Sequence, residues 1–402
     1  MLPVVTLPVN KEKTRSSVFE IFRVSFKLGL TSFGGPIAHL GYFHSEYIKR
    51  RQWLDERSYA DLVALCQLLP GPASSQVGIG IGTMRAGLLG GIAAWIGFTL
   101  PSALALILFA LLLHELPIDS YGWIHGLKIV AVAIVAQAIH SMGVKLAPDR
   151  SRATIAAVAA ALTLLWPAAG SQLLAIAGAA LIGWLLFRDG EAAAPPPLPM
   201  PISRQTGIVC LVLFALLLAG LPIIRELTSN HWAALVDSFY RSGSLVFGGG
   251  HVVLPLLERE VVPTGWISSN DFLAGYGAAQ AVPGPLFTFA SYLGAVDSGV
   301  LGAVIATIAI FLPAYLLVVG ALPFWHALLH NTHFRGAIVG INAAVVGILL
   351  AAFYDPIWVT AIAGAREFVL AAILFTMLTY WKPPIWVIIG AGAVGGILIQ
   401  QL

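Results

Sequence analysis

Residues 66–76 read CQLLPGPASSQ and place two prolines around one glycine inside an apolar run. Proline lacks a backbone N–H and clashes with the preceding helical turn, so one helix stops here and another starts afterwards. The same break recurs within AVPGP at residues 281–285. The apolar sequence on either side of each break is shorter than the ~20 residues that a spanning helix needs. Residues 59–85 and 272–297 are therefore predicted to form pairs of half-helices, or re-entrant hairpins.

Apolar residues dominate the rest of the chain. Of its 402 residues, 58% are hydrophobic and 10% are charged, and the mean hydropathy is +0.87. Soluble domains carry about 25% charged residues, so the composition excludes a soluble enzyme, a nucleic-acid-binding protein and a disordered chain. Two cysteines inside apolar runs do not make a disulfide framework. The sequence predicts an all-α polytopic membrane protein with the lipid bilayer as its surroundings.

Nine further apolar stretches are long enough to span the membrane. They lie near residues 88–113, 122–146, 152–169, 171–188, 207–224, 298–322, 336–353, 366–381 and 384–402. Lys and Arg gather near the N-terminus, at 44–57 and at 145–152, which the positive-inside rule places in the cytoplasm. No signal peptide is apparent. We therefore expect a cytoplasmic N-terminus and, after nine crossings, a C-terminus outside.

The two halves of the chain repeat the same features in the same order. The offset between copies stays between 214 and 212 residues for Phe33-Gly34-Gly35-Pro36 and Phe247-Gly248-Gly249-Gly250, Trp53 and Trp266, Gln67 and Gln280, Gly87 and Gly299, and Pro101 and Pro313. We predict a first repeat over 1–188, a Pro-rich linker over 189–206, one inverting helix over 207–230 and a second repeat over 231–402. That extra crossing would invert the second repeat, as in many secondary transporters.

These motifs resemble the CHR family of chromate ion transporters, in its long, two-domain ChrA type. The resemblance rests on residues 33–39 (FGGPIAH) with Glu46, residues 70–74 (PGPAS), residues 247–255 (FGGGHVVLP) and Gln280 with the second Pro-Gly-Pro. It covers essentially the whole chain. It implies export of chromate from the cytoplasm, coupled to the membrane potential or the proton gradient, with sulfate as the structural analogue.

A tetrahedral dianion needs hydrogen-bond donors and positive potential, which helix N-termini supply. The restart after Pro72 is expected to offer N–H groups of residues 73–76, and the second restart those of residues 286–288. We therefore predict substrate-binding roles for Gly71, Ser74, Ser75, Gln76, Gly284 and Thr288, for the glycine turns Gly34, Gly35, Gly248 and Gly249, and for Gln67 and Gln280. The alternative is that these are structural kinks and tight packing.

Charged residues at membrane depth are costly and are functional candidates. Lys27 and Arg85 are expected to neutralise the dianion, with no matching pair in the second repeat, although Arg85 could instead reach the interface. Lys128 is interpreted as interfacial. The candidates for proton coupling are His39, Glu46 and Asp61, with His251, Glu258 and Glu260 in the comparable stretch. The histidines 326, 330 and 333 lack acidic or cysteine partners, so no metal site is predicted.

The sequence predicts a secondary active transporter rather than an enzyme. It contains no P-loop, no nucleophile–base constellation and no sign of a cofactor. The alternatives are a passive anion channel, a transporter of sulfate or another anion, and an intramembrane enzyme acting on a lipid or quinone, which the isolated titratable residues disfavour. The expected location is a bacterial or archaeal cell membrane. The expected partner is a small oxyanion and not a nucleic acid, and a homodimer is left open.

Overall fold

The computed structural model describes residues 17–33, 35–114, 122–166, 169–187, 202–247, 252–325 and 332–401. Every regular element in these ranges is a helix, which confirms the all-α class. The first half contains α1 (Val18–Thr31), α2 (Gly35–Phe43), the π-helix η1 (His44–Arg50), α3 (Glu56–Leu68), α4 (Ala73–His114), α5 (Gly122–Leu146), α6 (Arg150–Leu165) and α7 (Ala169–Leu186). Helix α8 (Arg204–Thr228) joins the halves.

The second half repeats this order. It contains α9 (His231–Ser244), α10 (Val253–Val261), α11 (Ser269–Ala281), the short 3-10 helix η4 (Leu286–Thr288), α12 (Phe289–Ala321), η5 (Leu322–Phe324), α14 (Thr332–Ala352), the π-helix η6 (Phe353–Trp358), α15 (Val359–Ala361), α16 (Ala365–Thr376), the π-helix η7 (Met377–Trp381) and α17 (Ile385–Gln401). The two-repeat organisation therefore extends from the motifs to the helices.

Helix α4 is a hairpin of two arms rather than one rod. The backbone turns at Ala86 (φ −140°, ψ 26°) and Gly87 (φ 66°, ψ −155°). In a continuous helix, residues eight apart are about 12 Å apart, yet a Cβ on Gly90 would touch the carbonyl oxygen of Gly82. The chain therefore folds back on itself, and only glycine fits where the arms meet.

Helix α12 makes the same turn at the equivalent place. Ser298 has φ −140° and ψ 28°, and Gly299 has φ 65° and ψ −156°. A Cβ on Gly302 would touch the carbonyl oxygen of Gly294. The repeated Gly-x-x-Gly motif thus encodes a hairpin in each half: one glycine makes the turn and the other lets the arms approach.

Five helical segments within the described residues are long and apolar enough to cross a membrane. They are Ala73–Leu112, His125–Leu146, Arg204–Thr228, Leu286–Phe324 and Arg335–Ala361. The other predicted spans coincide with α6, α7, α16 with η7, and α17, which are shorter. The number nine therefore stays a prediction.

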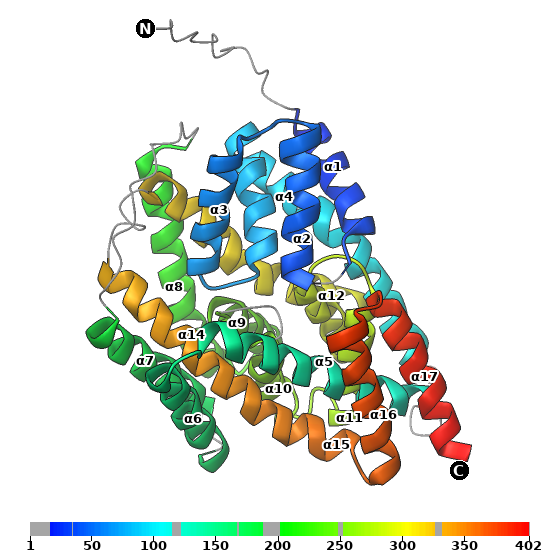
Figure 1. The fold of residues 1–402 in the computed structure, drawn as a ribbon. Coiled ribbons are helices and arrows are strands. Elements are labelled where there is room, and N and C mark those ends of the chain that lie inside the picture. Colours follow the sequence, from blue (N-terminus) through cyan, green and yellow to red (C-terminus); the bar gives the residue numbers. More distant parts are fainter. Residues whose placement is uncertain are drawn as a thin grey trace, which may run out of the picture.

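The two halves exchange their last helices. Helix α5 packs against α16 and α17, while α14 lies along α6 and α7 (Figure 1). Glycines allow these contacts, because a Cβ on Gly126 would touch the backbone of Gly392, and one on Gly340 the backbone of Ala179. Small residues let helices approach closely in membranes, where packing replaces the hydrophobic driving force. Each repeat is therefore completed by the other.

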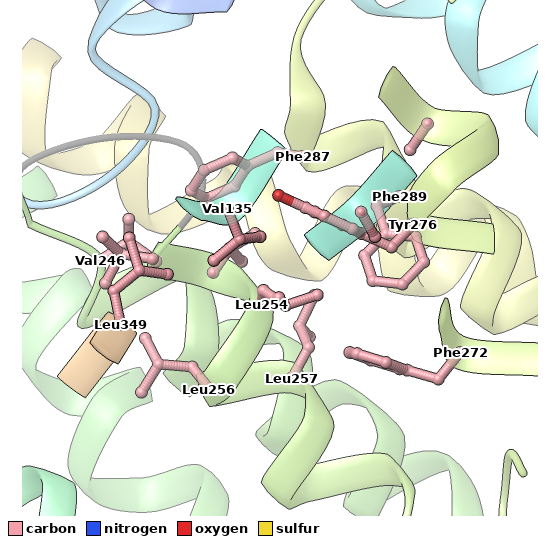
Figure 2. Packing of buried hydrophobic residues seen from close by; sticks show 14 of the residues in the cluster. Val135, Val246, Leu254, Leu256, Leu257, Phe272, Tyr276, Phe287, Phe289 and Leu349 are labelled. Atoms are coloured by element: carbon pink, nitrogen blue, oxygen red, sulfur yellow. The ribbon is translucent and has the colours of Figure 1, made fainter. Parts of the chain in front are cut away.

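The core at the centre of this exchange is aromatic and aliphatic. Figure 2 shows Phe272, Tyr276, Phe287 and Phe289 grouped with buried residues of other helices, including Val135. The rings of Phe272 and Phe289 lie 5.1 Å apart at 69°, and those of Tyr276 and Phe289 lie 5.8 Å apart at 70°. Edge-to-face packing of this kind favours one fixed arrangement of rings. It holds α11 against the first arm of α12.

Candidate functional site

The two Pro-Gly-Pro breaks meet the opposite repeat through a reciprocal pair of backbone hydrogen bonds. The N–H of Gly71 donates to the carbonyl oxygen of Val246 at 2.6 Å, and the N–H of Gly284 donates to that of Ser32 at 2.9 Å. Ser32 and Val246 each precede the Phe-Gly-Gly motif of their own repeat. Each break therefore lies beside the residue that precedes the glycine-rich motif of the other repeat.

The central glycine of each break is required by its conformation and its surroundings. Gly71 has φ +117° and Gly284 has φ +103°, values that favour glycine. A Cβ on Gly71 would lie 3.2 Å from the Cβ of Ala314, and a Cβ on Gly284 would lie 2.8 Å from Ser102 Oγ. Ala314 and Ser102 each follow the proline in the second hairpin arm of the other repeat. Each break therefore packs closely against the helical hairpin of the other repeat, α12 or α4.

A cavity of about 560 Å³ opens beside the second break. The first repeat contributes Phe33, Gly35 and Pro36 of its glycine motif, Tyr42, and two residues of α5. The second repeat contributes residues around its break and residues in and beside the turn between η7 and α17. These are Ala279, Gln280, Val282, Gly284, Leu286, Leu378, Lys382, Pro383, Pro384 and Trp386. Of the predicted site residues, Gly35, Gln280 and Gly284 therefore share one cavity.

The first break is lined by buried polar side chains. Ser74, Ser75 and Gln76 open α4 and are at most 3% exposed. His39 Nδ1 lies 3.2 Å from Ser74 Oγ, so this proton-coupling candidate sits at the break. Within the described residues, no hydrogen-bond partner is found for Ser75 Oγ and Gln76 Oε1. Unpartnered buried polar atoms are costly, so this cluster suits a polar ligand or water.

The free N–H groups expected at the helix restarts are partly used by the protein itself. The N–H of Gln76 donates to the carbonyl oxygen of Pro72 at 2.9 Å, and that of Thr288 to Pro285 at 3.0 Å. The Thr288 hydroxyl also donates to the carbonyl of Pro285, at 2.7 Å. The expectation that both groups are free for a ligand is therefore wrong, because a tight turn after each second proline satisfies them.

The two predicted cations have other partners. Lys27 Nζ lies 3.4 Å from Glu46 Oε2, with a half-exposed side chain, and Arg50 and Arg51 share that carboxylate. Arg85 lies over the Trp53 ring, with 5.6 Å from its Cζ to the ring centre. Arg85 also ends the first arm of α4, about 18 Å of helix away from the break. Neither residue is among those described as lining the cavity.

The second repeat does contain a counterpart of Lys27, contrary to the sequence-based expectation. Arg241 and Glu260 follow Lys27 and Glu46 by 214 residues, the repeat offset. Arg241 Nη2 lies 3.0 Å from Glu260 Oε2 and 2.8 Å from Asp237 Oδ2. Arg225 joins the same carboxylates at 3.2 and 3.5 Å. The duplicated ion pair joins the helix before each glycine motif, α1 or α9, to the segment that follows that motif.

The remaining predicted residues either have surroundings that the structure shows or lie outside the described residues. Lys128 is 8% exposed and donates to Asn270 Oδ1 at 2.7 Å, so it is buried between α5 and α11, and its position at the membrane interface stays a prediction. Gln67 is exposed, whereas Gln280 is half-buried. The predictions for Gly34, Gly248, Gly249, His251, His326 and His330, and for the side chains of Asp61 and His333, lie outside the described residues.

The sequence did not lead us to predict the cavity-lining residues in the turn between η7 and α17. Lys382 stands between two apolar stretches and is followed by two prolines. A lysine in so short a connection was a usable signal, because a rigid loop holds its charge beside the helix ends. Gln137 on α5 gave no signal, because it lies within a long apolar helix.

Two homologous helical repeats, apolar spans and a cavity that both repeats line are the features of a polytopic membrane transporter. The family model described as Chromate transporter matches residues 19–184 and again residues 233–397. The chain therefore belongs to the chromate transporter family, and the double match confirms the internal repeat.

Relatives cover either most of the chain or one repeat. The "Chromate transport protein" of Pseudomonas aeruginosa is 28% identical over 356 residues, which is 85% of this chain and 82% of that protein. The "Uncharacterized transporter MJ0718" of Methanocaldococcus jannaschii is 26% identical over 358 residues, 86% of this chain and 87% of that protein. The "Uncharacterized transporter YwrB" of Bacillus subtilis is 35% identical over 144 residues, 33% of this chain and 73% of that protein. No solved structure matches.

Proposed function

We propose that the protein exports chromate, or a similar tetrahedral oxyanion such as sulfate, from the cytoplasm by alternating access. The observation that carries this proposal is the cavity of about 560 Å³ to which both repeats contribute. One repeat supplies its glycine motif and the other its Pro-Gly-Pro break. A site of this composition changes its exposure when one repeat rocks against the other, as in transporters built from inverted repeats.

The proposed topology follows from the same symmetry. The repeats would be inverted about an axis in the membrane plane, with α8 as the extra crossing between them. The reciprocal hydrogen bonds of Gly71 and Gly284 support a two-fold relation, because each repeat offers the same donor and the same acceptor. The N-terminus would lie in the cytoplasm and the C-terminus outside, with the proton gradient or the membrane potential as the driving force.

Flux into everted membrane vesicles tests the proposal. Vesicles containing the protein should accumulate chromate when energised, and an uncoupler should abolish accumulation. Sulfate and molybdate, measured in parallel, define the preferred anion. Downhill flux that an uncoupler leaves unchanged would instead identify a passive anion channel. Vesicles that take up none of the three anions above the empty-membrane background would overturn the proposal.

A further inference from the structure

Lys382 brings a positive charge to the cavity. Among the described residues that line it, Lys382 is the one charged side chain; the others are apolar, glycine, proline, or neutral polar residues. A dianion that leaves water loses a large hydration energy unless charge and hydrogen bonds replace it. With no carboxylate in this lining, the ammonium group is not neutralised by a cavity neighbour. The cavity therefore has the charge that an anion requires.

The backbone at Lys382 is held in an unusual conformation. Lys382 has φ 51° and ψ 45°, in the left-handed region where a lysine is disfavoured by about 1–2 kcal/mol relative to a helical conformation. Its N–H donates to the carbonyl oxygen of Met377 at 2.8 Å, and Pro383 and Pro384 follow at once. A glycine or asparagine would adopt this turn at lower cost. A strained residue fixed by its neighbours favours a functional role for its side chain.

Gln280 supplies a hydrogen-bond donor on another wall of the same cavity. Its amide nitrogen is buried, and no hydrogen-bond partner for it is found within the described part of the chain. The amide nitrogen carries two N–H donors, and the hydrogen bonds found within the described residues use neither of them. Gln280 comes from the helix before the second break, whereas Lys382 comes from the turn before α17. Gln280 and Lys382 thus border one space from two elements, the first with a neutral amide and the second with a cation.

We propose that Lys382 binds the transported oxyanion, with the Gln280 amide as a second donor. The transport role of this contact rests on the proposed function, whereas the binding itself does not. Charge attraction makes Lys382 the capturing group, and the amide orients one oxygen. On the predicted span count, the turn at Lys382 faces the cytoplasm, where an exporter must load its substrate.

Binding to the purified protein tests this inference without relying on transport. Isothermal titration with chromate, sulfate and molybdate compares the wild type with Lys382→Asn and Lys382→Arg. Asparagine tolerates the left-handed turn and removes the charge, whereas arginine keeps the charge. Lys145→Asn is the matched control, because Lys145 is exposed at the end of α5 and lies outside the cavity lining. Thermal unfolding of each variant in detergent reports on folding.

Lys382→Asn should weaken the binding of each oxyanion that the wild type binds by about tenfold or more, the effect of one lost charge-assisted contact. Its unfolding temperature should stay level or rise, since the turn is relaxed. Lys382→Arg and Lys145→Asn should bind within about twofold of wild type. Equal affinity of Lys382→Asn and wild type, or no binding of any of the three oxyanions by wild type, would overturn the inference. Binding with this pattern but without vesicle flux would refute the proposed transport alone.

Discussion

The two Pro-Gly-Pro breaks have similar backbone conformations but are followed by residues of different chemistry. Both have a central glycine at positive φ, and both donate its N–H to the opposite repeat. The first break continues into Ser74, Ser75 and Gln76, all buried and polar. The second continues into Phe287, Thr288 and Phe289 and joins the aromatic core. Glycine and proline therefore give both breaks the same backbone conformation. The residues after them make the first break polar and the second mainly aromatic.

The two repeats therefore place different side chains around their breaks. The polar side chains around the first break include hydroxyl and amide groups for which the described residues supply no partner. The second break is followed by core residues, and Val282, Gly284 and Leu286 border the cavity that Gln280 and Lys382 also line. The following variants test where symmetry holds and where it fails.

The largest effect is expected where the hairpin arms touch. Gly90→Val and Gly302→Val each push a side chain into the backbone of the other arm, at Gly82 or Gly294. Backbone cannot yield without separating the arms, so both variants should lose more than about 4 kcal/mol of stability. Size-exclusion chromatography in detergent should recover little folded protein. Gly220→Val is the control, because a Cβ there meets nothing within 4 Å. A wild-type yield from either variant would break the symmetry of the hairpins.

The next largest effect concerns the breaks themselves. Gly71→Leu and Gly284→Leu add a side chain at positive φ against Ala314 or Ser102. Transport should fall by at least about tenfold in both variants, while membrane insertion persists, because the breaks are wedged between the repeats. Vesicle flux normalised to inserted protein measures this effect, and Gly143→Leu serves as a control in open space. Wild-type flux in both variants would leave the breaks without a role in transport.

The duplicated ion pairs should differ in strength. Arg225 and Arg241 are 27% and 22% exposed, whereas Lys27 is 53% exposed and can turn to water. Arg241→Gln should therefore lower stability by about 3 kcal/mol, because Asp237 and Glu260 both lose a cation, and Lys27→Gln by at most about 1 kcal/mol, because Arg50 and Arg51 still pair with Glu46. Thermal unfolding measures both. The double variant Arg241→Gln/Glu260→Gln should recover part of the loss. A greater loss in Lys27→Gln than in Arg241→Gln would reverse the comparison.

The first ion pair should also respond to pH. Burial raises the pKa of Glu46, hydrogen bonds from Arg51 and Arg50 lower it, and the net result is a pKa below its ordinary value. A lowered carboxyl pKa stabilises the fold above the unfolded-state pKa, and this stabilisation is lost as the pH falls through the folded-state value. Acid should therefore destabilise the wild type more than Glu46→Gln, when unfolding is followed from neutral pH downward. Parallel acid curves for the two proteins would contradict this expectation.

The smallest effects are expected at the hydroxyl groups after the breaks. Thr288→Val removes the hydrogen bond to the carbonyl of Pro285 and should cost about 1 kcal/mol of stability, with little change in affinity. Ser75→Ala removes a hydroxyl with no partner found in the described residues, so stability should stay within about 0.5 kcal/mol. Its chromate affinity should fall about threefold if the hydroxyl meets the ligand. Weaker chromate binding by Thr288→Val, with unchanged binding by Ser75→Ala, would place the polar site at the second break.

Much of the fold could be predicted because glycine and proline act locally. Two prolines around one glycine end a helix, so the breaks at 70–72 and 283–285 are visible in the sequence, whereas the single prolines Pro101, Pro222 and Pro313 lie within helices. The repeat was visible for the same reason, since its landmarks are glycines, prolines and tryptophans with a nearly constant offset. The sharp turns at Gly87 and Gly299 were less apparent, because an isolated glycine within an apolar helix is also common as packing.

The candidate site was less predictable, because it is assembled from segments far apart in the chain. The position of Lys27 within an apolar stretch suggested a buried charge, but it cannot reveal Glu46 folding back to meet it. Lys382 resembled an ordinary loop lysine until the exchange of α17 onto α5 placed its turn beside the first glycine motif. Side-chain neighbours across repeats depend on packing, and local sequence does not encode them.

The sequence by itself determined the membrane class, the duplication, the helix breaks and the family resemblance. Each follows from composition or from residues whose effects are confined to one or two helical turns. Only the tertiary structure decided which distant residues meet: Gly71 with Val246, Gly284 with Ser32, and Lys382 with the cavity that Gln280 lines. The physical reason is that close packing of helices from opposite repeats brings together residues more than a hundred positions apart, and that contact is a property of the whole chain.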